Sequence, residues 1–298
     1  MAKQLFYLPW WFARARFFGS RRPLQTVLFI SDKCNLTCKH CNVYNLANPN
    51  IKTTEQIIEE LKYSYAQGSR FVDFEGGEPM LWRDGEHNIN HLIHIAKEIG
   101  FFSTTVTTNA QMPFADCEAD SIWVSLDGIG EFHEYIRGEG TFARLEKNVA
   151  ECGHPDVSFN MVINAKNYTN VRDTIEYAKN NPAIRAISLN FHTPYEGTEY
   201  LFLEWDKRIK VIDEIIEMKR AGYPIINSIS GLKLMKHNKF SKQCWVSNFI
   251  MADGTRLPEC PGSIAGVCDQ CGFGMAGEMH SVFTLRPDTI MAGMKLRM

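Results

Sequence analysis

Residues 26–41 read TVLFISDKCNLTCKHC, an apolar run followed at once by three cysteines. The run at 26–30 is rich in β-branched and aromatic side chains and therefore predicts a buried strand. Cys34, Cys38 and Cys41 follow with the spacing C-x3-C-x2-C. Three thiolates on one loop can bind three irons of a cubane [4Fe–4S] cluster and leave the fourth iron without a protein ligand. An open iron can bind a small molecule and pass an electron to it, so the spacing predicts a catalytic cluster.

Zinc and disulfides are the alternative uses of these cysteines. Structural zinc normally takes four protein ligands, usually as two pairs, so three thiolates fit it poorly, although His40 is available as a fourth ligand. The nine cysteines are an odd number, and their spacings do not suggest the framework of a secreted protein. The iron–sulfur interpretation is favoured, and zinc stays open as the alternative.

A second motif, EGGEP at residues 75–79, follows the apolar residues 71–74. Together with the cysteine triplet it resembles the signature of the radical S-adenosylmethionine (SAM) superfamily, whose GGEP motif stands in this place. The resemblance implies that the backbone around Gly76 and Gly77 binds the amino acid end of SAM and that Glu78 faces its ammonium group. It also places Pro79 among the cofactor-binding residues.

Weaker motifs follow in the order that the family would place them. They are TTN at 107–109, SLDG at 125–128, HEYIRG at 133–138 and NMVIN at 160–164. The second resembles the ribose-contacting segment, the third the segment whose arginine meets the SAM carboxylate, and the fourth the strand on which adenine packs. The resemblance covers roughly residues 24–195. It implies SAM-binding roles for Asn109, Ser125, Asp127, Arg137, Asn160 and Val162.

Strand and helix patterns alternate along this part of the chain. The predicted strands lie at 26–31, 70–75, 101–108, 121–126, 157–163 and 185–191. The predicted helices lie at 53–67, 86–99, 132–150, 168–180 and 204–221, and the crossover at 109–120 is short. Thr53 and Gln56 form a capping box at the start of the first helix. Six such units predict an α/β fold with a parallel sheet, and the resemblance implies an open partial (βα)6 TIM-like barrel. Ligands of such sheets bind at the C-terminal ends of the strands, where the motifs fall.

Four more cysteines follow residue 240: Cys244, Cys260, Cys268 and Cys271. The sequence MADGT at 251–255 predicts a hairpin turn. The pattern resembles the SPASM extension in its short form, called Twitch, because no cysteine follows Cys271. The resemblance implies a second, auxiliary [4Fe–4S] cluster held by all four thiolates, with a zinc knob as the alternative. The expected divisions are an aromatic and basic segment at 1–24, the barrel at 25–200, a connecting helical region at 201–235 and a small Twitch-like domain at 236–298.

The N-terminal segment mixes aromatic and basic side chains, and no acidic residue precedes Asp32. This composition suits peripheral contact with a membrane surface, but the favoured interpretation is that the rings cover one end of the barrel. The net charge of −2 argues against bulk binding of nucleic acid. No apolar run is long enough to span a bilayer, and no convincing signal peptide is present. Reduced thiols and an oxygen-sensitive cluster predict a cytoplasmic location.

The resemblance implies an enzyme that cleaves SAM reductively to methionine and a 5′-deoxyadenosyl radical, supplied with electrons by a donor such as flavodoxin or ferredoxin. The radical would abstract hydrogen from, or add to, a small-molecule or lipid-like substrate. A peptide- or protein-modifying maturase is the first alternative, and a zinc-stabilised binding module without SAM cleavage is the second. His40 is expected to pack near the cluster or the adenine. His87, His91 and His94 share one helical face, for which exposure to solvent is favoured over metal binding.

Overall fold

The computed structural model describes residues 2–41 and 48–297 of the chain. Its centre is an eight-stranded sheet in the order β6-β5-β4-β3-β2-β1-β7-β8. The first six strands are β1 (Gln25–Phe29), β2 (Phe71–Glu75), β3 (Ser103–Thr108), β4 (Ser121–Ser125), β5 (Val157–Ile163) and β6 (Ala186–Phe191). They pair with their neighbours in parallel. The six predicted strands are therefore confirmed, each to within two residues at either end.

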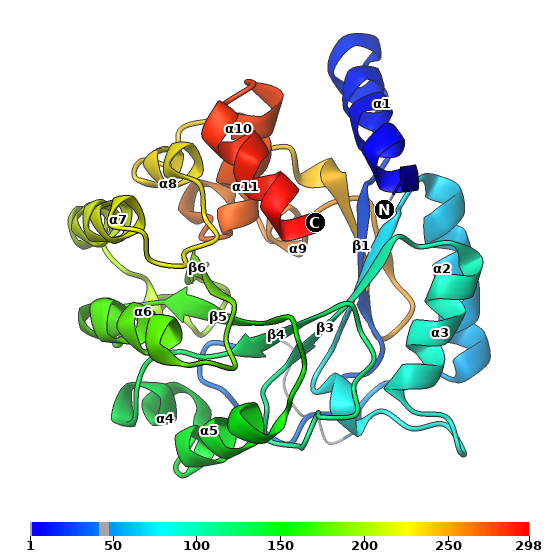
Figure 1. Cartoon of the computed structure of the whole chain (residues 1–298), viewed down its shortest axis with the longest axis horizontal. Coiled ribbons are helices and arrows are strands. Elements are labelled where there is room, and N and C mark those ends of the chain that lie inside the picture. The colour runs from blue at the N-terminus through cyan, green and yellow to red at the C-terminus, as the bar shows by residue number, and fades with distance from the viewer. Residues whose placement is uncertain (1, 42–47, 298) are drawn as a thin grey trace.

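Helices cover one face of this sheet, as Figure 1 shows. The helical segments of this region are α2 (Thr54–Gln67), η1 (Pro79–Leu81), α3 (Ile89–Ile99), α4 (Glu131–Arg137), α5 (Thr141–Glu151), η2 (Tyr168–Asn170), α6 (Val171–Asn180), η3 (Glu199–Leu201) and α7 (Trp205–Arg220). The capping box of α2 is confirmed, because Thr53 and Gln56 exchange side chain-to-backbone hydrogen bonds. The single helix predicted at 132–150 is wrong. Gly138 (φ 111°) and Gly140 (φ 72°) break it into α4 and α5, and glycine adopts such angles without steric cost.

The two faces of the sheet differ in chemistry. Leu28, Phe74, Val106, Ile122 and Phe159 alternate toward the helices and are fully buried in one hydrophobic core. The side chains between them point to the other face, are mostly polar, and are only partly buried: Asp73, Glu75, Thr107, Ser121, Ser125, Asn160, Ser188 and Asn190. Parallel sheets usually bury both faces in apolar side chains. The polar inner face therefore departs from this usual pattern.

The C-terminal third of the chain adds two strands to the sheet and then forms helical segments. β7 (Ser247–Ile250) pairs in parallel with β1, and β8 (Arg256–Leu257) pairs antiparallel with β7. The hairpin predicted at 251–255 is confirmed, since the Met251 amide donates to the Thr255 carbonyl at 2.9 Å. The remaining segments are α8 (Ile229–Met235), η4 (Cys244–Val246), α9 (Pro261–Ile264), η5 (Cys268–Gln270), α10 (Gly274–Phe283) and α11 (Pro287–Arg297). The cysteine-rich segment is thus attached directly to the strand that precedes the cysteine triplet.

The N-terminal segment forms α1 (Ala2–Phe18), which packs at the N-terminal ends of the strands. The Tyr7 hydroxyl donates to the Gly68 carbonyl at 2.7 Å, just before β2. The Trp11 indole donates to the Arg22 carbonyl at 2.8 Å, just before β1. Part of α1 therefore covers one end of the barrel. No helix in the described part of the chain combines the length and apolar character needed to cross a membrane.

Glu278 on α10 makes the packing of the C-terminal helices depend on pH. Its Oε1 accepts a hydrogen bond from the Ser228 amide at 2.8 Å, at the start of α8. Burial raises the pKa of its carboxyl to about 7. A pKa raised above its unfolded value means that the folded state binds the proton more tightly. The resulting stability is present below the unfolded pKa and is lost as the pH rises through the folded one.

We expect Glu278→Gln to remove this pH dependence. At pH 8 the variant should unfold with a free energy up to about 2 kcal/mol larger than that of the parent chain, because the amide keeps the acceptor and carries no charge to desolvate. Near pH 4.5 the two chains should be similar. Urea unfolding at both pH values measures the difference, with exposed Glu98→Gln as the control. Parallel pH profiles for the parent and Glu278→Gln would contradict the assignment.

Candidate functional site

The cysteine loop leaves β1 at the C-terminal edge of the sheet and is fixed there by its backbone. The Asp32 amide donates to the Asn50 carbonyl at 2.9 Å, and the Lys39 amide to the Ile136 carbonyl at 2.9 Å. The second bond joins the loop to α4, which carries Arg137. Cys34 and Cys41 are partly exposed, and Cys38 is buried. The three sulfurs are therefore presented on one loop that is held from both sides.

The GGEP turn holds the same loop from beneath. The Gly77 amide donates to the Ser31 carbonyl at 2.7 Å, and the Glu78 amide donates to the Lys33 carbonyl at 2.9 Å. A Cβ added to Gly76 would lie 2.3 Å from the Ser31 carbonyl oxygen, and one added to Gly77 would lie 2.2 Å from that of Lys33. The two glycines are therefore required by backbone-to-backbone contact with the cysteine loop. Their expected role in binding SAM stays a prediction.

Glu78 is buried and serves as an acceptor for the end of β3. Its Oε1 accepts from the Thr108 hydroxyl at 2.7 Å and its Oε2 from the Asn109 amide at 2.7 Å. Burial raises the pKa of this carboxyl, and these donors oppose the rise. The motif that follows β2 thus positions the motif that follows β3. That Glu78 also faces an ammonium group stays a prediction.

Asn109 and Arg137 bring hydrogen-bond donors to two of the three sulfurs. Asn109 Nδ2 lies 3.7 Å from Cys34 Sγ, and Arg137 Nη1 lies 3.8 Å from Cys38 Sγ. Burial raises the pKa of the thiols of Cys34 and Cys38. Donors and a guanidinium charge at the sulfur stabilise the thiolate form that binds metal. The sequence predicted both residues as SAM ligands, and the structure gives them contacts with the cysteines.

Asp127 holds Arg137 in place. Arg137 Nε donates to Asp127 Oδ2 at 2.7 Å, with both side chains buried. Burial alone would raise the pKa of Asp127, but Arg137, and after it His40 and His133, lower it overall. The Val162 amide donates to Asp127 Oδ1 at 3.1 Å, which ties the pair to β5.

Two of the remaining predicted residues, Ser125 and Asn160, lie on the inner face of neighbouring strands. Ser125 is the register partner of Asn160 between β4 and β5. Asn160 Oδ1 accepts from Asn190 Nδ2 at 2.8 Å, which joins it to β6. Pro79 is buried and begins η1 directly after Glu78. The residues predicted for the first site thus come from consecutive strands and from the loops and helical turns that follow them.

Two residues that the sequence analysis did not single out also belong to this edge. The ring centroid of His192, which follows β6, lies 6.5 Å from that of His40 on the cysteine loop. Asn167 is buried and donates to the Asp127 carbonyl at 2.9 Å and to the Val162 carbonyl at 3.0 Å. The position of His192 immediately after a predicted strand was the one available signal, and Asn167 gave none. His40 Nδ1 lies 3.8 Å from Asp127 Oδ2, and its expected packing near the cluster or the adenine stays a prediction.

The four later cysteines lie against the end of β6. The Phe191 amide donates to the Gly272 carbonyl at 2.8 Å, and the Gly272 amide donates to the Thr193 hydroxyl at 2.9 Å. Burial, followed by the charges of Cys260, Cys271 and Cys268, raises the pKa of Cys244 to about 12. The four thiols are thus close enough to influence one another. Among the described residues, no group of three or more His, Cys, Asp or Glu side chains forms a ready-made metal site.

His87, just before α3, and His91 and His94 on α3 do not converge on one point. The rings of His87 and His91 stack with centroids 3.8 Å apart. His87 Nδ1 lies 3.0 Å from the Thr54 hydroxyl, and His94 Nε2 lies 2.5 Å from Glu118 Oε2. These partners account for the histidines without a metal.

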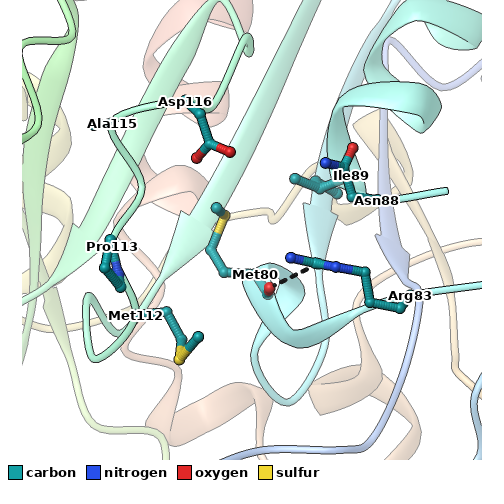
Figure 2. A pocket seen from close by; sticks show the side chains of 8 residues that line it. All are labelled: Met80, Arg83, Asn88, Ile89, Met112, Pro113, Ala115 and Asp116. Carbon is teal, nitrogen blue, oxygen red and sulfur yellow. Dashed lines mark hydrogen bonds between the residues drawn. The ribbon is translucent and has the colours of Figure 1, made fainter. Parts of the chain in front are cut away.

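A cavity of about 360 Å³ opens beside the GGEP turn, on the side of α3. Figure 2 shows Met80 between Arg83 and Asp116, with Met112 beside Pro113. Arg83 Nη1 donates to the Met80 carbonyl at 3.1 Å. None of the predicted SAM residues lines this cavity, so it is separate from the candidate site.

The family model of the radical SAM superfamily matches residues 28–178, just over half of the 298-residue chain. The chain belongs to the radical SAM superfamily. The matched span contains the cysteine triplet, the GGEP turn and Arg137, and members of this superfamily are enzymes.

Curated relatives are more distant. A probable GTP 3′,8-cyclase of Methanococcus aeolicus is 28% identical over 162 residues, covering 50% of this chain and 54% of that protein. The sporulation killing factor maturation protein SkfB of Bacillus subtilis is 24% identical over 205 residues, covering 63% and 48%. The chain spans about half the length of these relatives.

Solved structures of radical SAM proteins share the fold. SuiB of Streptococcus suis bound to S-adenosylmethionine superposes with a TM-score of 0.64 at 19% identity, covering 80% of this chain and 60% of SuiB. The protein anSMEcpe, bound to AdoMet and a peptide, superposes with a TM-score of 0.62 at 16% identity, covering 92% and 83%. At these identities the likeness supports the partial barrel alone.

We expect Gly77→Ala to displace the cysteine loop. The added Cβ would meet the Lys33 carbonyl at 2.2 Å, and a backbone atom cannot yield as a flexible side chain can. Iron bound after anaerobic reconstitution should fall several-fold. Gly293→Ala is the control, because no atom lies within 4 Å of its added Cβ. Full iron content in Gly77→Ala would show that the loop tolerates the clash.

We expect Asp127→Asn to cost about 3 kcal/mol of unfolding free energy, because it leaves the buried Arg137 charge without its counter-ion. Asp156→Asn is the matched control. Its pair with Arg185 has the same 2.7 Å distance but is exposed, so the cost should be below about 1 kcal/mol. Urea unfolding of the cofactor-free chains measures both. Equal costs would mean that burial of the Asp127 pair carries no weight.

Proposed function

We propose that the chain is a radical SAM enzyme in which Cys34, Cys38 and Cys41 bind a [4Fe–4S] cluster. When bound, that cluster supplies one electron that cleaves SAM to methionine and a 5′-deoxyadenosyl radical. The observation that carries the proposal is the packing of the three-cysteine loop, backbone to backbone, on the GGEP turn. Membership of the superfamily supports it.

The donor set fits such a cluster. Three thiols come from one loop, and cluster binding requires them as thiolates. Arg137 and Asn109 each bring an N–H group to a sulfur and favour that form. His40 Nδ1 is buried and has no hydrogen-bond partner among the described residues. In this proposal the guanidinium of Arg137 stabilises the thiolate of Cys38, and Asp127 orients Arg137.

The polar inner face favours a polar substrate over a lipid-like one. Thr107 Oγ1 lies 3.3 Å from Asp73 Oδ1 and 3.4 Å from Glu75 Oε1. Asn160 and Asn190 bring amides to the same face from β5 and β6. An acyl chain on this face would desolvate these groups without replacing their hydrogen bonds, which costs about 1–3 kcal/mol for each group. We therefore place a small polar molecule there.

A peptide is the second candidate substrate. SkfB is a maturation protein, one SuiB structure contains the precursor peptide SuiA, and anSMEcpe was solved with a peptide. The GTP cyclases act on a nucleotide by name. Peptides and nucleotides both present many hydrogen-bonding groups, which suits the inner face. A zinc-stabilised binding module without SAM cleavage is the rival from another class.

We further propose that Cys244, Cys260, Cys268 and Cys271 hold an auxiliary [4Fe–4S] cluster in a Twitch-like domain at 236–298. Arg208 Nη2 donates to the Cys271 carbonyl at 3.0 Å, and Asn238 Nδ2 donates to the Cys268 carbonyl at 2.9 Å. The end of β6 contacts this segment through Phe191 and the cysteine loop through His192. An auxiliary cluster there suits electron transfer or structure. Both clusters require a reducing, low-oxygen compartment and a donor such as flavodoxin or ferredoxin.

The test is anaerobic reconstitution followed by assay of 5′-deoxyadenosine with SAM and dithionite. We expect about eight irons per chain and SAM cleavage, with cleavage lost when Cys34, Cys38 and Cys41 become alanine. Cys117→Ala is the control, because this buried thiol belongs to neither set. About four irons with cleavage would keep the enzyme and turn the second set into a zinc or empty site. Zinc without deoxyadenosine would overturn the proposal.

A further inference from the structure

The helix α1 has an unpartnered face of large apolar side chains. Phe6, Trp10 and Phe17 are 80%, 48% and 67% exposed, and Phe18 at the end of the helix is 79% exposed. Positions 6, 10 and 17 fall within about 40° of one another on a helix that turns about 100° per residue. They therefore form one stripe, about 100–140° around the helix from the buried Trp11. Clustered exposure of this kind marks an interaction surface.

Neighbouring elements extend the stripe. A groove of about 610 Å³ opens between α1 and the barrel, and its walls are Phe6, Tyr7, Trp10, Tyr65, Arg70 and Phe102. On the other side, Arg16 Nε donates to the Phe283 carbonyl at 3.2 Å. This contact brings the turn after α10 alongside, with Leu285 54% exposed. Figure 1 shows α1 projecting from the molecule next to α10 and α11.

The same end of the molecule is positively charged. Arg14, Arg16, Arg21 and Arg22 are all exposed, and none of them forms an ion pair with a carboxylate among the described residues. The Arg14 guanidinium lies 5.2 Å from the Trp10 ring centroid, and that of Arg16 lies 5.7 Å from the Phe17 ring centroid. The whole chain carries a net charge of −2, so this cationic end is a local feature.

We propose that α1 docks the protein on the surface of a bilayer rich in anionic lipids. Phenylalanine and tryptophan rings insert favourably at the headgroup level, and each arginine near an anionic surface adds about 1 kcal/mol. A second copy of the chain fits less well, because two such faces would bring eight unneutralised arginines together. The surface therefore matches a partner that is both apolar and negatively charged.

The docking face lies at the opposite end of the barrel from the cysteine loop. Gly68 and Phe102, which α1 contacts, each precede a strand, whereas Cys34, Cys38 and Cys41 follow one. Docking would leave the cysteine end turned toward the aqueous phase. The proposal thus concerns where the protein is held, and it stands apart from the proposed SAM chemistry.

Flotation of the full-length chain with vesicles tests the proposal. Vesicles of phosphatidylcholine mixed with phosphatidylglycerol should carry the protein upward, and vesicles of phosphatidylcholine alone should carry much less. Binding should weaken at 1 M salt, where the Debye length falls to about 3 Å. Arg14→Gln with Arg21→Gln should lower the partition coefficient about 30-fold, which is about 2 kcal/mol. Arg144→Gln with Arg220→Gln, two exposed arginines elsewhere, is the charge-matched control.

Phe17→Ser with Phe18→Ser tests the apolar part and should weaken binding about tenfold or more. Tyr200→Ser is the control, since this ring is 52% exposed on another part of the surface. Equal binding to both kinds of vesicle, no effect of the α1 variants, or an equal loss in the controls would overturn the proposal. So would binding of a single-stranded oligonucleotide, or self-association that depends on Phe17, in place of vesicle binding.

Discussion

The structure of the candidate site depends on one constraint, the approach of two backbones at the end of β1 and β2. Gly76 and Gly77 leave no room for a Cβ against Ser31 and Lys33, and two amide-to-carbonyl hydrogen bonds close the gap. Because β1 and β2 pair in parallel and in register, their C-terminal ends emerge side by side. The loop that carries three thiols is thereby fixed by the sheet itself. The position of the cysteine loop therefore follows from the pairing of β1 with β2 and does not depend on side-chain packing alone.

A series of polar contacts links the loops that follow neighbouring strands at this edge of the sheet. Glu78, which follows β2, accepts hydrogen bonds from Thr108 and Asn109 at the end of β3. The side chain of Asn109 in turn contacts the sulfur of Cys34. Asp127 joins β4 to β5 and orients Arg137 toward Cys38. Each buried charge in this series has a partner, which burial requires. The motifs that seem separate along the sequence are therefore one hydrogen-bonded unit.

Much of this unit could be predicted, and the reasons differ between its parts. The strands were predictable because the runs at 26–30 and 157–163 are rich in β-branched and aromatic residues, which favour β-strands. The break between α4 and α5 was missed because Gly138 and Gly140 were placed inside one helix, whereas their φ values of 111° and 72° end it. The pairing of β7 with β1 was not predictable, since the strand is four residues long and its partner lies more than 200 residues away. His192 and Asn167 act through tertiary contacts that no local spacing records.

The pairing of β7 with β1 has a mechanical consequence for the whole molecule. It attaches the second cysteine set to the strand that precedes the first. Trp245, just before β7, packs against Trp11 of α1 with ring centroids 5.8 Å apart. The two ends of the β1–β7 pair thus meet different parts of the protein: α1 and Cys244 lie at the start of the strands, and the loop of Cys34, Cys38 and Cys41 follows the end of β1. The parallel pairing runs in register from Gln25 and Ser247 to Leu28 and Ile250. The aromatic, arginine-rich α1 and the loop of Cys34, Cys38 and Cys41 therefore lie at opposite ends of the same pair of strands.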